Sequence, residues 1–297
     1  QQVLLAKRPD HLHQGGLWEF PGGKQEPGES REEALRRELG EELGIEITHF
    51  RPLIQVPHHY PDRSVLLDVW EVNKWRGDAT GLEGQEICWV TQDQLQQYQF
   101  PQANLPIIKA CQLPSHYLIT PAINVAETQF LAQLEAAQRR GITLLQFRQH
   151  ELSSSAFEEL ARKTIDVCHR AGCKVLINGR AEQVRRLGAD GLQLNARDLI
   201  SAVARPLPEP YLVAASCHNQ DELEQAARLS LDFAVLSPVQ QTTSHPDAVP
   251  LGWETFRQLV SGAVLPVYAL GGVSQADTTE AWENGGQGIA AIRGLWE

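Results

Sequence analysis

The feature that most limits what this chain can fold into is a regular alternation of short apolar runs and helix-like segments, which starts at Tyr117. Eight apolar runs occur: "YLIT", "TLLQFR", "KVLIN", "GLQLN", "YLVAAS", "FAVLS", "PVYALGG" and "GIAAI". Helical segments separate most of them, at residues 126–140, 155–171, 181–187, 220–229, 253–261 and 276–283. Buried strands that alternate with helices form parallel sheets. Eight such units predict a compact, closed (β/α)8 barrel of the TIM type with its site at the carboxyl ends of the strands, and an open doubly wound sheet is the alternative.

The residues before about 112 combine short strands with one strong helix. The runs "VLLA" and "VLLDVWEV" are strand-like by their β-branched content and partial alternation. Residues 30–43 are predicted to be helical, because Ala34, Leu35, Leu39 and Leu43 recur at helical spacing. Gly44 follows at the position of a C-terminal glycine cap. The first part of the chain is therefore expected to form a separate α/β domain.

A boundary between the two parts is expected in "PQANLPIIKACQLPSH", which has three prolines and little periodicity. We therefore predict domains at 1–112 and 117–297. The sequence contains no Met and begins within the strand-like "VLLAKRP". This start predicts a fragment in which the first strand of the first domain is missing.

Charge and cysteine content narrow the classes of partner. The formal net charge of -11 argues against a broad non-specific grip on nucleic acid, but it allows a small anionic substrate that is held through a metal ion. No run of eighteen apolar residues occurs, so we expect no membrane partner. The five cysteines form no C-x-x-C pair, which favours reduced thiols and a cytoplasmic location. The oligomeric state stays open.

Three glutamates crowd into five positions of the predicted helix. Glu38, Glu41 and Glu42 are spaced i, i+3 and i+4, so a helix places all three on one face. A solvated charged face is the simplest interpretation. The alternative is a cation among the carboxylates, and hard oxygen ligands suit Mg2+ or Mn2+ together with substrate phosphates. Gly22 and Gly23 come just before, where a tight turn brings backbone carbonyls towards the same ion.

The segment from Gly23 to Ile45 reads G-x5-E-x7-R-E-L-x-E-E-x-G-I, and it matches every defined position of the signature of Nudix hydrolases. The resemblance implies hydrolysis of a nucleoside diphosphate linked to another group. It also implies that this helix holds Mg2+, which Mn2+ can replace. It implies four metal ligands in the segment and gives catalytic roles to two of them. The ligands are Glu38, Glu41, Glu42 and the carbonyl of Gly23. The catalytic residues are Glu38 and Glu41, and Glu38 or another acidic residue activates water.

The rest of the first domain resembles the MutT branch of that family, in "LLAKRP", "GLWEFPGGK", "YPDRSVLLDVWEV", "GLEGQEICWV" and "FPQANLPII". This branch hydrolyses 8-oxo-dGTP to the monophosphate and pyrophosphate, as part of nucleotide-pool sanitation. The resemblance implies that Asn104 recognises the oxidised guanine, because its amide suits a purine edge. It implies further substrate contacts from Arg8, Phe20, Lys24 and Arg63. Glu83, in "GLEGQE", becomes a further metal ligand or catalytic base.

The second domain resembles the family of thiamine phosphate synthase and the related thiazole tautomerase (TenI-like) proteins. The resemblance rests on "YLITP", "QFR", "LING", "GADGLQL", "SCH", "LSPV" and "ALGGV", in that order. It implies a thiamine-related phosphate ligand. The implied contacts are Gln146, Arg148, Asn178, Ser216 and Gly272, and His218 becomes the acid–base candidate, since a histidine suits proton transfer near neutral pH.

Several positions depart from the synthase pattern. Its lysine after the second strand is His150, and its metal-binding aspartate after the third strand is Gly179. Its T-x-T-K loop ends at His245, and its late serine is Arg293. Asp198 alone matches a metal position. A pyrophosphate leaving group therefore lacks its usual neutralisation.

Three hypotheses follow from these departures. The first is a MutT-like hydrolase fused to a barrel whose active site is altered. The second makes the barrel a binding or regulatory module without turnover. The third has the Nudix domain act on pyrophosphates related to thiamine, which gives the fusion one purpose, although fusion by itself is only an associational argument.

Overall fold

The computed structural model describes residues 2–11, 14–59, 64–242 and 248–296. The chain divides into two compact units, Gln1–Gln112 and Leu113–Glu297. Within the described part, no helix has the length and apolar character needed to cross a membrane.

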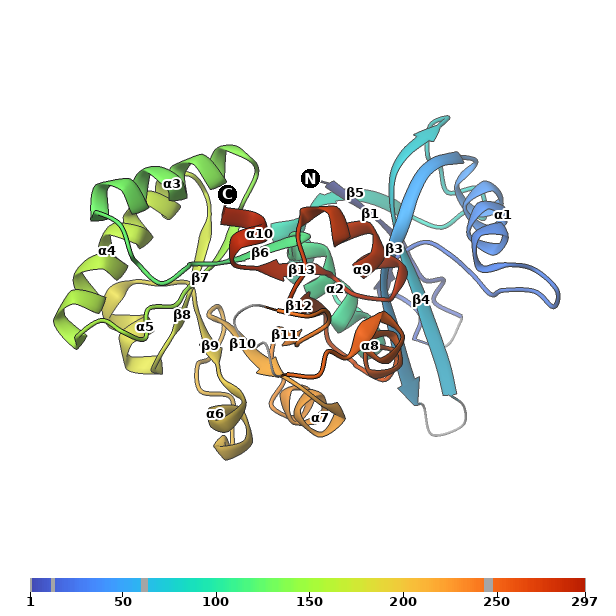
Figure 1. Ribbon diagram of the computed structural model, residues 1–297. Coiled ribbons are helices and arrows are strands. Elements are labelled where there is room, and N and C mark those ends of the chain that lie inside the picture. Colours follow the sequence, from blue (N-terminus) through green and yellow to red (C-terminus); the bar gives the residue numbers. More distant parts are fainter. Residues whose placement is uncertain (1, 12–13, 60–63, 243–247, 297) are drawn as a thin grey trace. The chain divides into compact units, whose positions relative to one another are not determined.

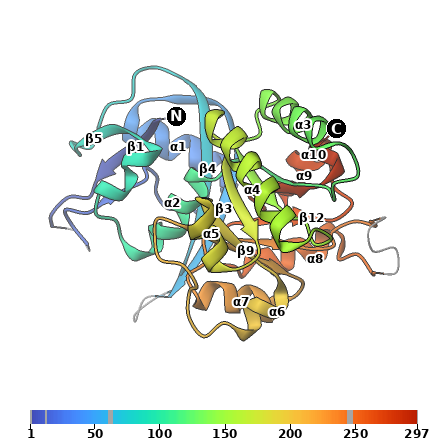
Figure 2. The same cartoon turned by 90° about the vertical axis from the view of Figure 1, so that its left-hand side faces the viewer.

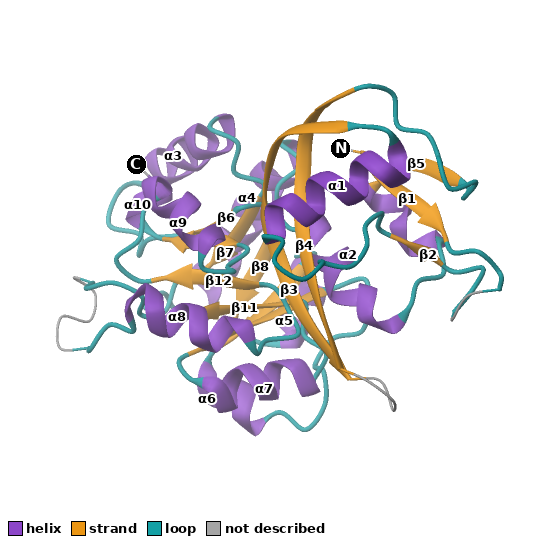
Figure 3. Ribbon diagram, turned by 90° about the vertical axis from the view of Figure 1, so that its right-hand side faces the viewer, coloured by secondary structure: helices purple, strands orange, loops and turns teal. Residues whose placement is uncertain are grey.

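The first unit consists of two antiparallel sheets and two α-helices. Strand β1 (Gln2–Lys7) lies between β2 (Trp18–Glu19) and β5 (Ile87–Thr91) in a three-stranded sheet. Strands β3 (Glu46–His59) and β4 (Ser64–Arg76) form a long two-stranded ribbon. Helix α1 (Arg31–Leu43) lies beside this ribbon (Figure 3), because its apolar face, with Leu39 and Leu43, packs with Ile47 of β3 and with Ile45, which precedes that strand.

The proline-rich segment in which the domain boundary was expected contains the second helix of this unit. It forms the 3-10 turn η2 (Gln102–Asn104) and helix α2 (Leu105–Gln112), which follow the 3-10 helix η1 (Gln92–Gln97). Pro106 lies in the first turn of α2, where a missing backbone N–H costs no hydrogen bond. Ile107 and Ala110 pack with residues of β3, so this segment belongs to the core of the first unit.

The second unit is a closed barrel of eight parallel strands, with the neighbour order β10-β11-β12-β13-β6-β7-β8-β9. Figures 1 and 2 show helices around the outside of these strands. The strands are β6 (His116–Ile119), β7 (Leu144–Phe147), β8 (Lys174–Asn178), β9 (Gly191–Leu194), β10 (Leu212–Cys217), β11 (Phe233–Leu236), β12 (Val267–Leu270) and β13 (Gly288–Ala291). The helices are α3 (Glu127–Arg139), α4 (Ser154–Arg170), α5 (Ala181–Leu187), α6 (Ala196–Ser201), α7 (Gln220–Arg228), α8 (Gly252–Ser261), the 3-10 turn η3 (Gln275–Asp277), α9 (Thr278–Glu283) and α10 (Arg293–Trp296).

The strand runs are apolar throughout because both faces of each strand are buried. Tyr117 packs with Phe233 and Tyr268 in the cluster that fills the barrel, and the ring centroids of Tyr117 and Phe233 are 5.1 Å apart. Leu118, the next residue of the same strand, packs instead in the outer cluster, with Phe130 of α3. The closed barrel confirms the predicted fold class and excludes the open sheet. The short helices α6 and α10 were not predicted.

Two buried or half-buried carboxylates strengthen the amino-terminal ends of the strands. Asp190 accepts a hydrogen bond of 2.7 Å from the Val175 N–H, and Asp232 accepts one of the same length from the Val213 N–H. Arg205 pairs with Asp232 at 2.6 Å. Polar groups at this end therefore serve the fold, and the carboxyl ends of the strands remain the place for a site.

Candidate active sites

Helix α1 is capped at both ends, so its first and last residues, and with them the positions of its glutamates, are fixed locally. Ser30 and Glu33 form a capping box, with the Glu33 N–H donating to Ser30 Oγ at 3.2 Å and the Ser30 N–H donating to Glu33 Oε2 at 2.8 Å. Gly44 ends the helix in the left-handed conformation, with φ of 70°. The three glutamates therefore share one side of a helix whose two ends are fixed locally.

Arg37 is the centre of the charged face. Its guanidinium donates two hydrogen bonds of 2.9 Å to Glu29, one of 2.9 Å to Glu38 and one of 3.2 Å to Glu41. It also donates to the backbone carbonyl of Lys24 at 3.0 Å, while the Lys24 side chain is exposed. These bonds raise the pKa of Arg37 further. One cation thus fixes two of the predicted catalytic carboxylates and the loop before the helix.

The two glycines before the helix lie against the other glutamates. The Gly22 N–H donates to Glu42 Oε2 at 2.8 Å. A Cβ on Gly23 would stand 2.1 Å from Glu38 Oε2, so only glycine leaves room for that carboxylate. The loop and the helix face are therefore packed together through backbone, without an intervening side chain.

The carboxyl of Glu42 has a raised pKa. Burial raises its pKa to about 7, the Gly22 N–H opposes this rise, and the negative charges of Glu83, Glu19 and Glu38 add to it. Four carboxylates from three segments of the first unit therefore lie close enough to interact. The sequence did not single out Glu19, whose own pKa is raised by burial.

Among the described residues, the structure has no group of three or more Asp, Glu, His or Cys side chains that already surround one point as a metal cage. Arg37 holds Glu38 and Glu41, and Gly22 holds Glu42. The donor set still fits a hard divalent cation, because carboxylates are concentrated beside Gly23, which places no side chain between its backbone and the Glu38 carboxylate. A cation would also favour the charged form of Glu42, whose pKa is raised by burial and then by neighbouring negative charges.

The predicted base pocket combines an aromatic pair with a buried amide. Phe20 stacks on Phe100, with ring centroids 5.6 Å apart and an interplanar angle of 21°. Asn104 lies one 3-10 turn after Phe100 and is 8% exposed. No described residue hydrogen-bonds to its side-chain amide, which leaves that amide available for a ligand.

Of the two arginines predicted to bind phosphate, the structure describes only Arg8. Arg8 forms an ion pair with Glu19, and both side chains are about a quarter exposed. It is thus one member of a pair rather than a separate surface cation. Arg63 lies outside the described residues.

At the barrel rim, the ends of β6 and β7 carry an amide and a cation. Thr120 Oγ1 accepts from the Arg148 N–H at 3.0 Å and joins the two strand ends. Gln146 is 3% exposed, and neither its amide nor the Arg148 guanidinium has a side-chain partner in the described part of the chain. His150 is exposed, and its pKa is lowered by desolvation and then by the charge of Arg148. Gln149, which the sequence analysis did not select, locks this turn by accepting from the Ile123 N–H at 3.0 Å.

A short polar chain runs from the barrel interior to the rim. The Tyr117 hydroxyl donates to Gln193 Oε1 at 3.0 Å, and Gln193 Nε2 donates to Ser216 Oγ at 3.2 Å. His218, two residues further on, is exposed, and its Nδ1 lies 2.8 Å from the Ser237 carbonyl oxygen. Within the described residues, the other ring nitrogen of His218 has no partner. Ser216 and His218 therefore reach the same rim as Gln146, because the carboxyl ends of parallel strands meet there.

The positions that depart from the synthase pattern have local structural reasons. Asn178 ends β8, and a Cβ on the following Gly179 would lie 2.6 Å from Gln183 Oε1, so a larger side chain there must displace Gln183. Asp198 accepts from Asn195 Nδ2 at 2.8 Å within the cap of α6. A carboxylate pair for a metal is thus absent at these two positions.

The remaining predicted positions at the rim lie on turns. Gly272 has φ of 71°, and a Cβ there would lie 2.4 Å from the Gln241 carbonyl oxygen, so its conformation and packing both require glycine. Arg293 is exposed at the start of α10. His245 lies outside the described residues.

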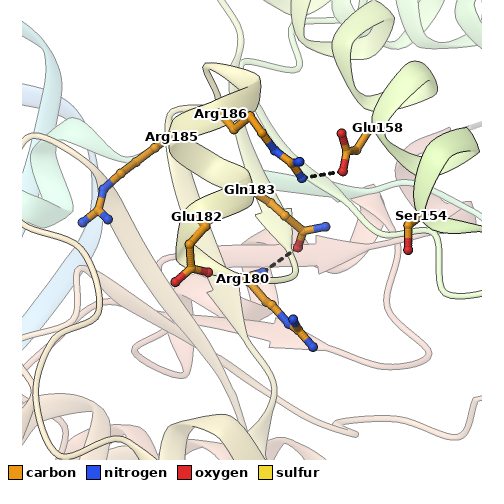
Figure 4. A pocket seen from close by; sticks show the side chains of 7 residues that line it. All are labelled: Ser154, Glu158, Arg180, Glu182, Gln183, Arg185 and Arg186. Atoms are coloured by element: carbon orange, nitrogen blue, oxygen red, sulfur yellow. Dashed lines mark hydrogen bonds and ion pairs between the residues drawn. The ribbon is translucent and has the colours of Figure 1, made fainter.

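An open hollow of about 950 Å³ lies on the outside of the barrel unit, between α4 and α5 (Figure 4). Arg186 pairs with Glu158 across it, and the Arg180 N–H donates to Gln183 at 2.8 Å. Both signs of charge line this hollow and its lining side chains are mostly exposed, so it does not define a ligand class.

Comparison with known proteins agrees with the two folds. A family model for thiamine monophosphate synthase matches residues 116–295, and one for the Nudix domain matches residues 1–110. The chain belongs to the thiamine monophosphate synthase family over its barrel and to the Nudix family over its first unit. The first unit is accordingly a pyrophosphohydrolase of the Nudix class.

Named relatives match each unit separately. The thiamine-phosphate synthase of Chloroflexus aurantiacus is 32% identical over 177 residues, which are 59% of this chain and 82% of that protein. The thiamine-phosphate synthase of Lysinibacillus sphaericus is 32% identical over 186 residues, 61% of this chain and 87% of that protein. The 8-oxo-dGTP diphosphatase of Escherichia coli K12 is 39% identical over 107 residues, 36% of this chain and 83% of that protein.

The contact between Gly23 and Glu38 gives a direct test of the first site. Gly23→Ala should lower the rate of nucleotide hydrolysis by about 10- to 100-fold, since the added methyl group displaces the Glu38 carboxylate. Stability should change little, because a carboxylate end can swing away. Gly40→Ala, in the middle of the same helix and without close contacts, is the matched control and should keep full activity. A fully active Gly23→Ala variant would contradict this packing.

The raised pKa of Glu42 predicts a pH dependence of stability. The carboxyl is protonated in the folded state up to pH of about 7 but only to about 4.5 when unfolded, so it stabilises the fold below 4.5 and this contribution is lost as pH rises through 7. In the presence of a chelator, the unfolding free energy of wild type should therefore fall more than that of Glu42→Gln between pH 5 and pH 8. Glu32→Gln, an exposed carboxylate of the same helix, is the control. Parallel curves for wild type and Glu42→Gln would refute the shift.

Proposed function

We propose that the first unit is a Mg2+-dependent hydrolase that cleaves 8-oxo-dGTP to 8-oxo-dGMP and pyrophosphate. The observation that carries this choice of substrate is Asn104, a buried residue whose amide has no side-chain partner in the described chain and which follows the stacked pair of Phe20 and Phe100. An amide that offers both a donor and an acceptor suits the altered edge of 8-oxoguanine. The aromatic pair offers an apolar surface beside it.

The catalytic roles follow from the glutamate face. Glu38, beside Gly23, takes a proton from water, and the water oxygen bonds to one of the two phosphorus atoms of the α–β bridge. The bond from that phosphorus to the bridging oxygen breaks, and the products are 8-oxo-dGMP and pyrophosphate. Glu38, Glu41, Glu42, Glu83 and the Gly23 carbonyl would hold Mg2+, which when bound neutralises phosphate oxygens and lowers the pKa of water. Arg37 orients Glu38 and Glu41 through its hydrogen bonds.

The substrate side of the site is completed by cations. Arg8 is held by Glu19 at the edge of the sheet and is assigned to phosphate, as are Lys24 and Arg63. Because the Arg8 guanidinium is already paired with Glu19, it can contact phosphate only if it binds both groups at once or leaves Glu19. Arg8 is therefore expected to affect substrate binding more than the chemical step.

A panel of substrates tests this proposal. With Mg2+, wild type should prefer 8-oxo-dGTP over dGTP, ADP-ribose and thiamine-pathway pyrophosphates. Glu38→Gln should lower the rate by at least about 100-fold, because a general base is lost. Asn104→Ala should lower kcat/KM for 8-oxo-dGTP by about 10- to 100-fold and reduce its advantage over dGTP. Asn73→Ala, an exposed asparagine of the same unit, is the control.

The outcomes of this panel separate the alternatives. A clear preference for ADP-ribose would reject the assignment of Asn104. A preference for thiamine-pathway pyrophosphates would mean that the barrel indicates the pathway in which the hydrolase works.

We infer for the barrel a binding role towards a phosphate related to thiamine, without turnover. The supporting observation is the combination at the rim of Arg148, whose guanidinium has no side-chain partner among the described residues, and buried Gln146, with Gly179 in place of a metal-binding carboxylate. One cation and an amide suit a monophosphate better than the departure of pyrophosphate, which needs more neutralising charge. His218 and Ser216 remain candidates for catalysis if turnover occurs.

Calorimetric titration with thiazole phosphate and thiamine phosphate tests the binding role. Wild type should bind at least one of them, and Arg148→Ala should weaken binding by about 10-fold or more, the loss expected for a charged hydrogen bond. Arg139→Ala, an exposed arginine of α3, should bind like wild type. Formation of thiamine phosphate from its two precursors would instead show that the barrel is an enzyme.

A further inference from the structure

The loop between β4 and β5 is attached to the carboxyl end of helix α1. The last carbonyls of a helix need donors from elsewhere. Here the Thr80 N–H donates to the Leu43 carbonyl at 3.0 Å, and the Leu82 N–H donates to the Glu42 carbonyl at 3.0 Å. The loop that carries Glu83 is therefore fixed to the very residue of the helix whose side chain carries the raised pKa.

Gln85 adds a second attachment, through its side chain. Its Nε2 donates to the Glu42 carbonyl at 3.0 Å, and its Oε1 accepts from the Glu83 N–H at 2.9 Å. One half-buried amide thus joins the backbone of Glu42 to the backbone of Glu83. These two residues are 41 positions apart in the sequence.

The loop is shaped for this bridge. A Cβ on Gly81 would lie 2.2 Å from the Gln85 carbonyl oxygen and 3.1 Å from its Oε1, so the chain passes directly against Gln85. Gly84, with φ of 80°, closes the turn, and its N–H donates to the Gly81 carbonyl at 3.1 Å. The two glycines permit a loop too tight for larger residues.

The Glu83 side chain itself is exposed and forms no hydrogen bond or ion pair within the described part of the chain. Its position therefore depends on its backbone, and that backbone is held by Gln85. A glutamine is specifically suited here, because the bridge needs one donor and one acceptor. A glutamate would lack the donor, and an asparagine is one methylene shorter.

We propose that Gln85 is a positioning residue of the hydrolase, whose amide bridge sets the spacing between Glu42 and Glu83 so that both carboxylates can hold one divalent cation. The inference rests on the metal role proposed above for these two glutamates. Gln85 contacts neither substrate nor metal in this assignment and acts only through the backbone of its two partners.

The test combines metal affinity with kinetics on the full chain. Mn2+ affinity, measured by electron paramagnetic resonance, should fall by about 10-fold in Gln85→Ala and in Gln85→Glu, the loss typical when a residue that orients metal ligands is removed. The kcat with nucleotide should fall to a similar extent, while KM changes by less than about 2-fold. Amide hydrogen exchange at Glu83 should become faster in Gln85→Ala, since its acceptor is gone.

The matched control is Gln94→Ala. Gln94 Oε1 accepts from the Thr91 N–H at 3.0 Å in a similar local cap, but it lies in η1, away from the glutamates. This variant should keep the Mn2+ affinity and kcat of wild type. Loss of either property in Gln94→Ala equal to that in Gln85→Ala would overturn the proposal, because a general loosening of the unit would then explain both.

A double-mutant cycle with Glu83→Gln separates the positioning role of Gln85 from the metal role of Glu83. If Gln85 acts through Glu83, Gln85→Ala should cause no further loss of Mn2+ affinity in the Glu83→Gln background. Additive losses of Mn2+ affinity would overturn the proposal. Normal Mn2+ binding by Gln85→Ala together with impaired binding by Glu83→Gln would overturn it as well. The metal role of Glu83 would survive both of these results. If Glu83→Gln and Glu42→Gln bind Mn2+ like wild type, the metal role itself fails.

Discussion

The concentration of negative charge on helix α1 is the constraint on which the first unit depends. Three glutamates on one helical face repel one another unless cationic groups or N–H donors face them. Arg37 and the Gly22 N–H supply this compensation, and both draw the preceding loop onto the helix. The glycine loop, the helix and the acidic face therefore form one electrostatic assembly. Burial, followed by the charges of Glu83, Glu19 and Glu38, raises the pKa of Glu42 within this assembly.

The carboxyl end of the same helix recruits a distant segment. Its free carbonyls accept from the loop between β4 and β5, which brings Glu83 towards Glu42. The same hydrogen bonds thus pair the last carbonyls of the helix and bring the fourth carboxylate to the acidic cluster. We therefore expect the site to depend also on residues that carry no charge, among them Gly23 and Gln85.

The barrel follows a different design. Its interior is filled by packed aromatic and aliphatic side chains, and polar groups are concentrated where the strands end. At this rim Arg148 and Gln146 have no side-chain partners in the described chain, whereas Asp198 is used by a helix cap and Gly179 is packed against Gln183. These observations support the binding role proposed above for the barrel. In that proposal both units handle phosphate groups, by separate means.

The sequence by itself determined the elements that rest on local periodicity and spacing. The eight apolar runs predicted the barrel, because a strand buried on both faces must be apolar at every position. The spacing of Glu38, Glu41 and Glu42 and the glycine after Leu43 predicted the acidic helix and its end. Each of these inferences needs only neighbours within a few residues, which is the range over which sequence patterns are informative.

Only the tertiary structure decided the relations that depend on distant contacts and burial. It paired Arg8 with Glu19, turned the proline-rich segment after Phe100 into helix α2, and placed the Gln85 amide between Glu42 and Glu83. It also raised the pKa of Glu42, which no local pattern could show because the effect sums burial and charges from three separate segments. The physical reason is the same throughout: desolvation and long-range pairing exist only once the chain has folded.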